Sequence, residues 1–135
     1  MLMKKPAIQL SDLVFFAVSV SVLVSGGQML SIDSDLGRHI TIGNYILDHR
    51  IVPTQDLFSH TLTGESRPPY EWLSQVAFAI SNRLLGLDGV ILLTAILISV
   101  SILAVFRHSI HRSGSPLVAL FVTLLVAAAT SLHWL

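Results

Sequence analysis

The stretch from Leu84 to Phe106, LLGLDGVILLTAILISVSILAVF, contains one charged side chain, Asp88, close to its start. As a helix it would be apolar on every side, without the polar stripe of a surface helix in a soluble protein. At about 1.5 Å per residue, a helix of this length matches the roughly 30 Å hydrocarbon core of a bilayer. The stretch therefore predicts a membrane-spanning helix.

Two further stretches have the same character and no charge, Leu13–Leu30 (LVFFAVSVSVLVSGGQML) and Pro116–Leu135 (PLVALFVTLLVAAATSLHWL). In lipid the backbone must satisfy its own hydrogen bonds, so helix is the expected conformation. The prediction is an all-α integral membrane protein, one module of residues 1–135 with three transmembrane helices at 13–30, 84–106 and 116–135. A cleaved signal peptide is the alternative for the first stretch, but the apolar run is long and no A-x-A site follows it.

The composition agrees with a lipid environment. Of the 135 residues, 53% are hydrophobic and 12% are charged, and the mean hydropathy is +0.74. A soluble domain has about twice that share of charge. The formal net charge is zero, which argues against a nucleic-acid partner, and the absence of cysteine excludes disulfides and thiolate metal sites.

The basic residues predict the orientation. Lys4 and Lys5 precede the first span, and the sequence RHSIHRSGS (107–115) connects the second span to the third. The loop of residues 31–83 has four arginines and six acidic residues. By the positive-inside rule we expect a multi-pass protein of the bacterial inner membrane with a cytoplasmic N-terminus, an extracytoplasmic loop and an extracytoplasmic C-terminus, where Trp134 would lie at the outer interface.

The long loop has helical signals of its own. Apolar residues recur between Asp33 and His49 at helical spacing, which predicts a short helix lying along the membrane surface. Pro53 ends it, and a turn-rich segment leads to Pro68-Pro69, which opens a second short surface helix with Glu71 in its first turn. Small side chains of the first span suit close packing against a partner helix: Ser19, Ser21, Ser25, Gly26 and Gly27.

Asp33 and Asp35 form an Asp-x-Asp pair just beyond the first span. Two carboxylates so close can share a divalent cation, or one can act as a base while the other tunes it. His39 follows Asp35 by four residues and would share its helical face. The alternative is structural, with Asp33 as the helix cap and Asp35 complementing the helix dipole.

Three other groups of residues have both a functional and a structural interpretation. Asp56 lies in DLFSHT beside a Ser-His pair that lacks any G-x-S-x-G context, so an Asx-type turn is the alternative to catalysis. Glu71-Trp72 could line a pocket, or could be a helix-start acid and an interfacial anchor. Arg38, with Arg50 and Arg67, could bind an anionic group such as a lipid phosphate, or could pair with loop acids.

The order of these motifs resembles a known family. After an N-terminal span come D-x-D-L-G-R-H-I-x-x-G-x-Y-I-L (33–47), V-P-x-x-D-x-F-S-x-T (52–61), G-E-x-R (64–67) and E-W-L (71–73). This resembles the N-terminal region of bacterial GT-C class membrane glycosyltransferases. Such enzymes transfer a sugar from a polyprenyl-phosphate carrier at the outer face of the membrane.

The resemblance implies that Asp33 and Asp35 form the catalytic acidic motif, with a divalent metal ion such as Mg or Mn as a cofactor they could bind. It implies a substrate-binding role around the same pocket for four further residues: His39, Asp56, Glu71 and Trp72. Arg38 stands where the family pattern would have an aromatic residue, and is retained as a candidate for binding the anionic substrate. Membrane lipid and polyprenyl-phosphate sugar are the expected ligands.

The alternative function is a non-catalytic transmembrane subunit that packs against and stabilises a larger membrane complex; a small lipid-binding or transport accessory is a third. The three predicted spans are fewer than the many of the enzymes, so the isolated chain is expected to be inactive and to work with other membrane protein subunits.

Overall fold

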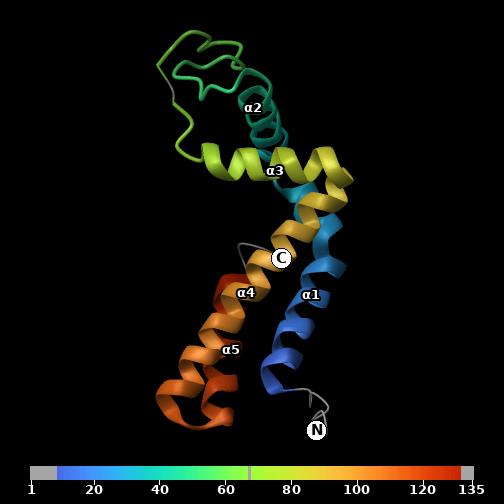
Figure 1. The fold of residues 1–135 in the computed structure, drawn as a ribbon, viewed down its shortest axis with the longest axis vertical. Helices are drawn as coiled ribbons and strands as arrows, with labels where there is room; N and C mark the ends of the chain where they lie inside the picture. Colours follow the sequence, from blue (N-terminus) through green and yellow to red (C-terminus); the bar gives the residue numbers. More distant parts are fainter. Residues whose placement is uncertain (1–8, 67, 132–135) are drawn as a thin grey trace, which may run out of the picture. The chain divides into compact units, whose positions relative to one another are not determined.

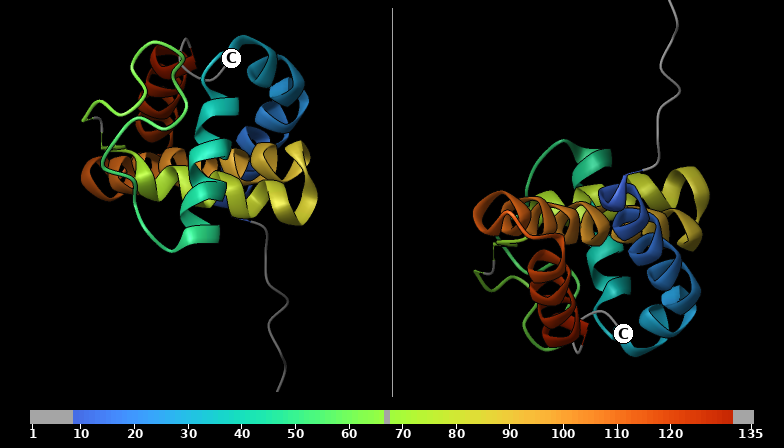
Figure 2. Two further views of the ribbon diagram at one scale, coloured as in Figure 1. Left: turned by 90° about the horizontal axis from the view of Figure 1, so that it is seen from above. Right: turned by 90° about the horizontal axis from the view of Figure 1, so that it is seen from below.

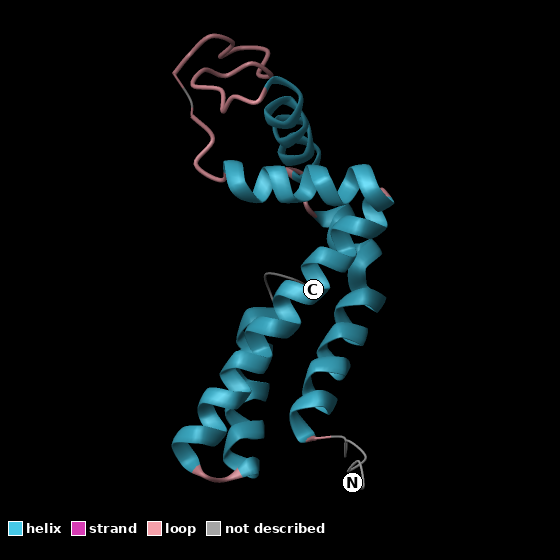
Figure 3. Ribbon diagram, in the orientation of Figure 1, coloured by secondary structure: helices cyan, strands magenta, loops and turns pink. Residues whose placement is uncertain are grey.

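The computed structural model describes residues 9–66 and 68–131, and within these ranges the chain is all-helical (Figures 1 and 3). The five helices are α1 (Leu10–Ile32), α2 (Leu36–His49), α3 (Trp72–Leu85), α4 (Leu87–Ser113) and α5 (Pro116–Ser131). The described residues form no strand, only an isolated antiparallel bridge between Gln55 and Ser66. The all-α prediction is therefore confirmed for the described ranges.

The described residues fall into two compact units. Unit 1 takes the chain up to Ser31 and from Ile91 onward, and so contains α1, α5 and most of α4. Unit 2 is Ile32–Val90, with α2, α3, the segment between them and the first turn of α4. Two helices are long and apolar enough to cross a membrane, at Leu10–Ser31 and Leu87–Ser113, whereas α5 is a shorter apolar helix.

The first helix extends beyond the predicted limits of 13–30 at both ends. The backbone N–H of Gln9 donates to the carboxylate of Asp12 at 2.9 Å, and the N–H of Asp12 donates to the Gln9 carbonyl at 3.0 Å. This arrangement satisfies backbone groups that a helix N-terminus leaves free, as in a capping box. Helix α1 therefore begins at Leu10, on the polar side of the apolar run.

The helix that contains most of the predicted second span, 84–106, has other limits than that span. Gly86 has a positive φ of 65° and separates α3 from α4, which then begins at Leu87. At the other end α4 continues through the basic residues to Ser113, because cationic side chains are favourable in the last turns of a helix. The predicted connection 107–115 is reduced to residues 114 and 115, and Gly114 turns the chain into α5.

The predicted third span, 116–135, corresponds to α5 over Pro116–Ser131. The last four residues, including Trp134 and its expected place at the outer interface, lie outside the described part of the chain.

Within unit 1, α1 and α4 are in direct contact. The hydroxyls of Ser19 and Ser99 are hydrogen-bonded at 2.8 Å, and Ser99 is fully buried. Gly26 lies against the side chain of Ile91. Ser19 and Gly26, two of the small residues predicted to suit close helix packing, therefore pack against α4 of the same chain.

Within unit 2, α2 crosses over α3 (Figure 2). Gly43 lies against the backbone carbonyl of Gln75 and the methyl group of Ala79, and a Cβ at position 43 would overlap both. The buried apolar residues of α2 are Leu36, Ile42 and Ile46. The packing of unit 2 therefore buries the apolar residues that gave the segment 33–49 its helical spacing, and the predicted position of this helix along the membrane surface stays a prediction.

Candidate functional site

Asp56 organises the segment between α2 and α3. Its side chain accepts hydrogen bonds from the backbone N–H groups of Phe58 at 3.0 Å and Ser59 at 2.8 Å, and from the Ser59 hydroxyl at 2.7 Å. Its own N–H donates to the Glu65 carbonyl at 2.8 Å, and its carbonyl accepts from the N–H of Gly64 at 2.8 Å. The predicted Asx-type turn is confirmed, and it closes residues 55–66 into an ordered loop.

Aromatic contacts tie this loop to α2. Tyr45 stacks on His49 one turn later with ring centroids 4.1 Å apart, and it meets Phe58 of the loop edge-on at 6.2 Å. Such pairs contribute about 0.5–1.5 kcal/mol beyond the area they bury. The loop is thus held at its base by Asp56 and at its side by Tyr45.

Together, α2, the loop and the approach to α3 enclose a cavity of about 490 Å³. A volume of this size is within the range of sites for small organic ligands. Its walls combine aliphatic, aromatic, proline and charged side chains: Arg38, Thr41, Ile42, Pro53, Gln55, Asp56, Leu57, Phe58, Ser59, Pro68, Pro69, Tyr70 and Glu71. One cation and two carboxylates therefore border the same space.

Three of the predicted site residues, Arg38, Asp56 and Glu71, line this cavity. Glu71 occupies the N-cap position of α3 rather than its first turn, and its side chain makes no capping hydrogen bond. Trp72 is the first residue of α3 and is largely exposed, and it does not line the cavity. Three residues of the cavity wall, from separate segments of the chain, were thus among the site residues predicted from the sequence.

The two predicted catalytic residues, Asp33 and Asp35, do not line the cavity. The Asp33 carboxylate accepts from the N–H of Asp35 at 2.9 Å, which makes a tight turn between α1 and α2. Asp35 takes the N-cap position of α2 without a side-chain capping bond, and its carboxylate pairs with Arg38 at 3.4 Å. Asp33 therefore does not cap α2 as predicted, because its carboxylate accepts a hydrogen bond from the N–H of Asp35, the residue before the helix begins.

His39 faces α3 rather than Asp35. Its Nδ1 lies 3.2 Å from the side-chain nitrogen of Gln75, and its ring lies 6.4 Å from that of Phe78. Gln75 is fully buried, and its Oε1 has no hydrogen-bond partner in the described structure. His39 thus contributes to the contact between α2 and α3. It does not line the cavity, although the resemblance implied that it would.

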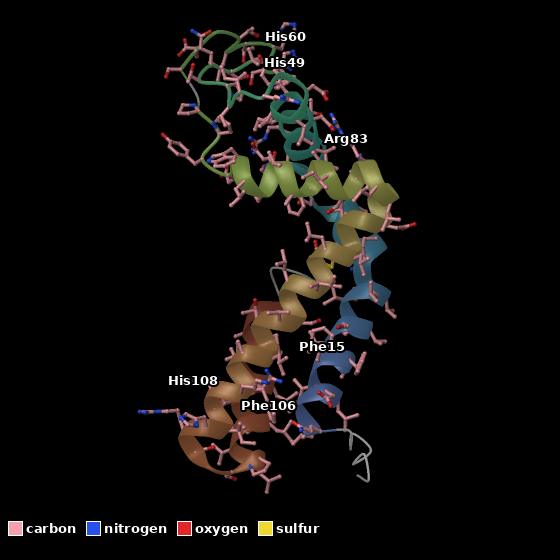
Figure 4. The ribbon with its side chains drawn as sticks, in the orientation of Figure 1. Phe15, His49, His60, Arg83, Phe106 and His108 are labelled. Atoms are coloured by element: carbon pink, nitrogen blue, oxygen red, sulfur yellow. The ribbon has the colours of Figure 1, made fainter. Side chains whose placement is uncertain are left out.

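The sequence interpretation missed the polar contact between α2 and α3. Arg83 donates through Nε to the Asn44 side chain at 2.6 Å and through Nη2 to the Asp48 carboxylate at 2.6 Å. Figure 4 shows the Arg83 side chain extending from α3 toward α2. The available signal was that Arg83 is the only charged residue within α3, because a lone charge on an apolar helix requires a polar partner or water.

Chemically, the cavity can accept hydrogen bonds from ligand hydroxyls through Asp56 and Glu71, and it can bind an anionic group through Arg38. No group of three or more His, Cys, Asp or Glu side chains arranged for a metal ion occurs among the described residues. Comparisons of the chain with protein families, curated proteins and solved structures found no match.

Proposed function

We propose that this chain is the N-terminal module of a GT-C-like membrane glycosyltransferase that uses a lipid-phosphate-linked sugar donor and works with further membrane-spanning helices. The observation that carries the proposal is the cavity of about 490 Å³, in which Arg38, Asp56 and Glu71 meet although they come from separate parts of the chain. These are residues that the resemblance and the charge pattern had singled out.

In this proposal Arg38 binds the anionic part of a substrate, because a guanidinium presents several donors to phosphate oxygens. Asp56 and Glu71 accept hydrogen bonds from sugar or acceptor hydroxyls. Asp35 is linked to the cavity through its ion pair with Arg38. Either Asp35 or Asp33 takes the proton of the acceptor hydroxyl as the acceptor oxygen bonds to the anomeric carbon of the sugar, and the bond from that carbon to the polyprenyl phosphate breaks so that the phosphate leaves. These steps use side chains of this chain alone, and a divalent ion would need ligands besides the two aspartates.

The proposed setting is the bacterial inner membrane. Helices α1, α4 and α5 would cross it, with the N-terminus and the α4–α5 turn in the cytoplasm and unit 2 outside. The exposed basic residues at the end of α4 support this orientation, because Arg107, His108, His111 and Arg112 would then all lie on the cytoplasmic side.

Sugar transfer by the full membrane assembly tests the catalytic part. Asp35→Asn keeps the size of the side chain but removes the negative charge, so transfer from a polyprenyl-phosphate sugar should fall by about 10²-fold or more. Asp33→Asn is tested in parallel, and Asp48→Asn is the matched control because Asp48 pairs with Arg83 outside the cavity wall. Normal transfer by both the Asp33 and the Asp35 variant contradicts the catalytic role.

A non-catalytic subunit is the second candidate. It is favoured by the local roles of Asp33 and Asp35, since one completes a turn and the other forms an exposed ion pair. The aspartate variants distinguish it from the first candidate: a subunit co-purifies with a larger membrane protein in mild detergent, and that complex keeps its full activity when both aspartates are replaced by asparagine.

A further inference from the structure

The last two turns of α4 have two faces of different chemistry. On one face Phe106 is 2% exposed and Ile110 is half-buried. The other face carries four exposed basic side chains, and Figure 4 shows one of them, His108, on a different side of α4 from Phe106. At 3.6 residues per turn the four positions fall within an arc of about 140°. We call these residues the basic face of α4: Arg107, His108, His111 and Arg112.

The basic face has no carboxylate partner within the described part of unit 1. The ion pairs reported above belong to unit 2, and neither Arg107 nor Arg112 pairs with a described residue. In the sequence of unit 1 the only acidic residue is Asp12, whose carboxylate accepts the backbone N–H of Gln9. Like charges at neighbouring positions of a helical face repel one another. An anion from outside the chain would therefore stabilise this face.

The start of α5 adds partial positive charge beside the basic face. Only Gly114 and Ser115 separate the two helices. Pro116 has no backbone N–H, and those of Leu117 and Val118 form no hydrogen bond with any described residue. Unpaired N–H groups at a helix N-terminus favour anions. Side-chain cations and free backbone donors thus both favour an anion at this end of unit 1.

The position along α4 indicates which anion is available. Helix α4 is long and apolar enough to cross a membrane, and its apolar run ends at Phe106, where the basic face begins. In a bilayer the end of such a run lies at the level of the lipid headgroups, whose anionic groups are phosphates. A guanidinium can donate two parallel hydrogen bonds to phosphate oxygens, and an imidazole N–H can donate another.

We propose that the basic face of α4 and the first turn of α5 form a binding site for the phosphate group of an anionic phospholipid. The proposal rests on the membrane setting proposed above, but not on sugar transfer, and it concerns unit 1 alone. It adds a ligand to the proposed orientation, which requires only that these residues stay on the cytoplasmic side. The bound lipid neutralises the basic face and holds the turn between α4 and α5 at the membrane surface.

The experiment measures which lipid lies next to this end of the complete chain in phosphatidylcholine vesicles. The chain has no cysteine, so Ser113→Cys gives one site for a fluorophore at the end of α4. Phosphatidylglycerol or phosphatidylcholine with a nitroxide high on the acyl chain is then added, and each quenches the fluorophore when it lies beside it. The ratio of the two quenching efficiencies gives the preference for the anionic lipid, and flotation of the chain with the vesicles reports insertion.

We expect phosphatidylglycerol to be preferred by about fivefold or more, since a single arginine at a membrane surface favours anionic lipid by about that factor. Replacing Arg107 and Arg112 together by glutamine should bring the ratio close to that of a neutral surface. Replacing both by lysine should keep most of the preference. Both replacements are good helix formers, and circular dichroism checks that the helices remain. Arg83→Gln is the matched control, because it removes an arginine of unit 2.

Equal quenching by the two lipids, or a preference that survives in the glutamine variant, overturns the proposal. Soluble glycerol phosphate that abolishes the preference, when sodium chloride of the same ionic strength does not, shows a site for free phosphate and overturns the choice of lipid. A chain that does not float with the vesicles overturns the membrane setting and this proposal with it. The aspartate variants that test sugar transfer should keep the lipid preference, so either proposal can fail alone.

Discussion

At position 43 the backbone of α2 approaches α3 so closely that no side chain fits. A Cβ there would overlap the Gln75 carbonyl, which is part of the α3 backbone, and would come within 2.8 Å of the Ala79 methyl. A backbone carbonyl inside a helix cannot rotate away, so the helices would have to separate. The glycine therefore sets the distance between α2 and α3.

Gly43→Ala should loosen unit 2 by about 1–3 kcal/mol, the usual cost of overpacking a tight contact. Amide hydrogen exchange in α2 should accelerate by roughly five- to 150-fold, since about 1.4 kcal/mol corresponds to a factor of ten. Gly37→Ala in the same helix is the control, because a Cβ at position 37 meets nothing within 4 Å. Equal exchange rates in the two variants contradict this account of Gly43.

Two substitutions at Asp56 separate its structural role in the turn from a chemical role of its negative charge. Asp56→Ala removes the acceptor for three hydrogen bonds, so the loop 55–66 should lose about 1–3 kcal/mol of local stability. Limited proteolysis should cut this loop much faster. Asp56→Asn keeps a carbonyl oxygen for the two backbone N–H groups and should protect most of the loop. A loop that is cut no faster in the alanine variant contradicts the turn.

At the scale of elements, the ion pair and the close packing between α2 and α3 differ in how much they stabilise unit 2. The Arg83–Asp48 pair is short at 2.6 Å, but its side chains are 44% and 58% exposed. Water screens such a pair, so its contribution is about 0.2–1 kcal/mol. The close packing at Gly43 is therefore expected to contribute more to the stability of unit 2 than the ion pair does.

A double-mutant cycle on Arg83→Gln and Asp48→Asn checks this ranking. The coupling energy from exchange or thermal unfolding should be at most about 1 kcal/mol and should decrease at high salt. Asp35→Asn serves as a control, because Asp35 pairs with Arg38 and not with Arg83. A coupling well above the effect of Gly43→Ala would reverse the order of the two contacts.

At the scale of the whole molecule, the proposed orientation makes a direct prediction. Single cysteines at Thr63, in the exposed loop of unit 2, and at Ser113, at the end of α4, should react with membrane-impermeant maleimide from opposite faces. Intact cells should label the Thr63→Cys variant only, and permeabilised cells should label both. Labelling of both positions in intact cells contradicts the topology, because Arg107 and Arg112 should keep Ser113 inside.

Local chemistry made part of this molecule predictable. Long uncharged runs predicted helices because a chain in an apolar environment has to satisfy its backbone hydrogen bonds within the helix. The Asp56 turn was predictable for a similar reason, since its partners Phe58 and Ser59 follow within three residues. The ends of helices were predicted less well, because Gly86 and the Asp12–Gln9 contact act through backbone geometry that hydropathy does not record.

Only the tertiary structure decided which faces meet. His39 and Gln75 are 36 residues apart, and the hydrogen bond between them requires α2 to cross α3 near Gly43. That crossing buries the apolar face of α2 and leaves Leu73, Ile80 and Leu84 of α3 exposed. In the same unit Arg38, Asp56 and Glu71 line one cavity, whereas Asp33 and Asp35 do not line it. The periodicity of a helix shows that it has an apolar face, but the shape of its neighbour determines what that face touches.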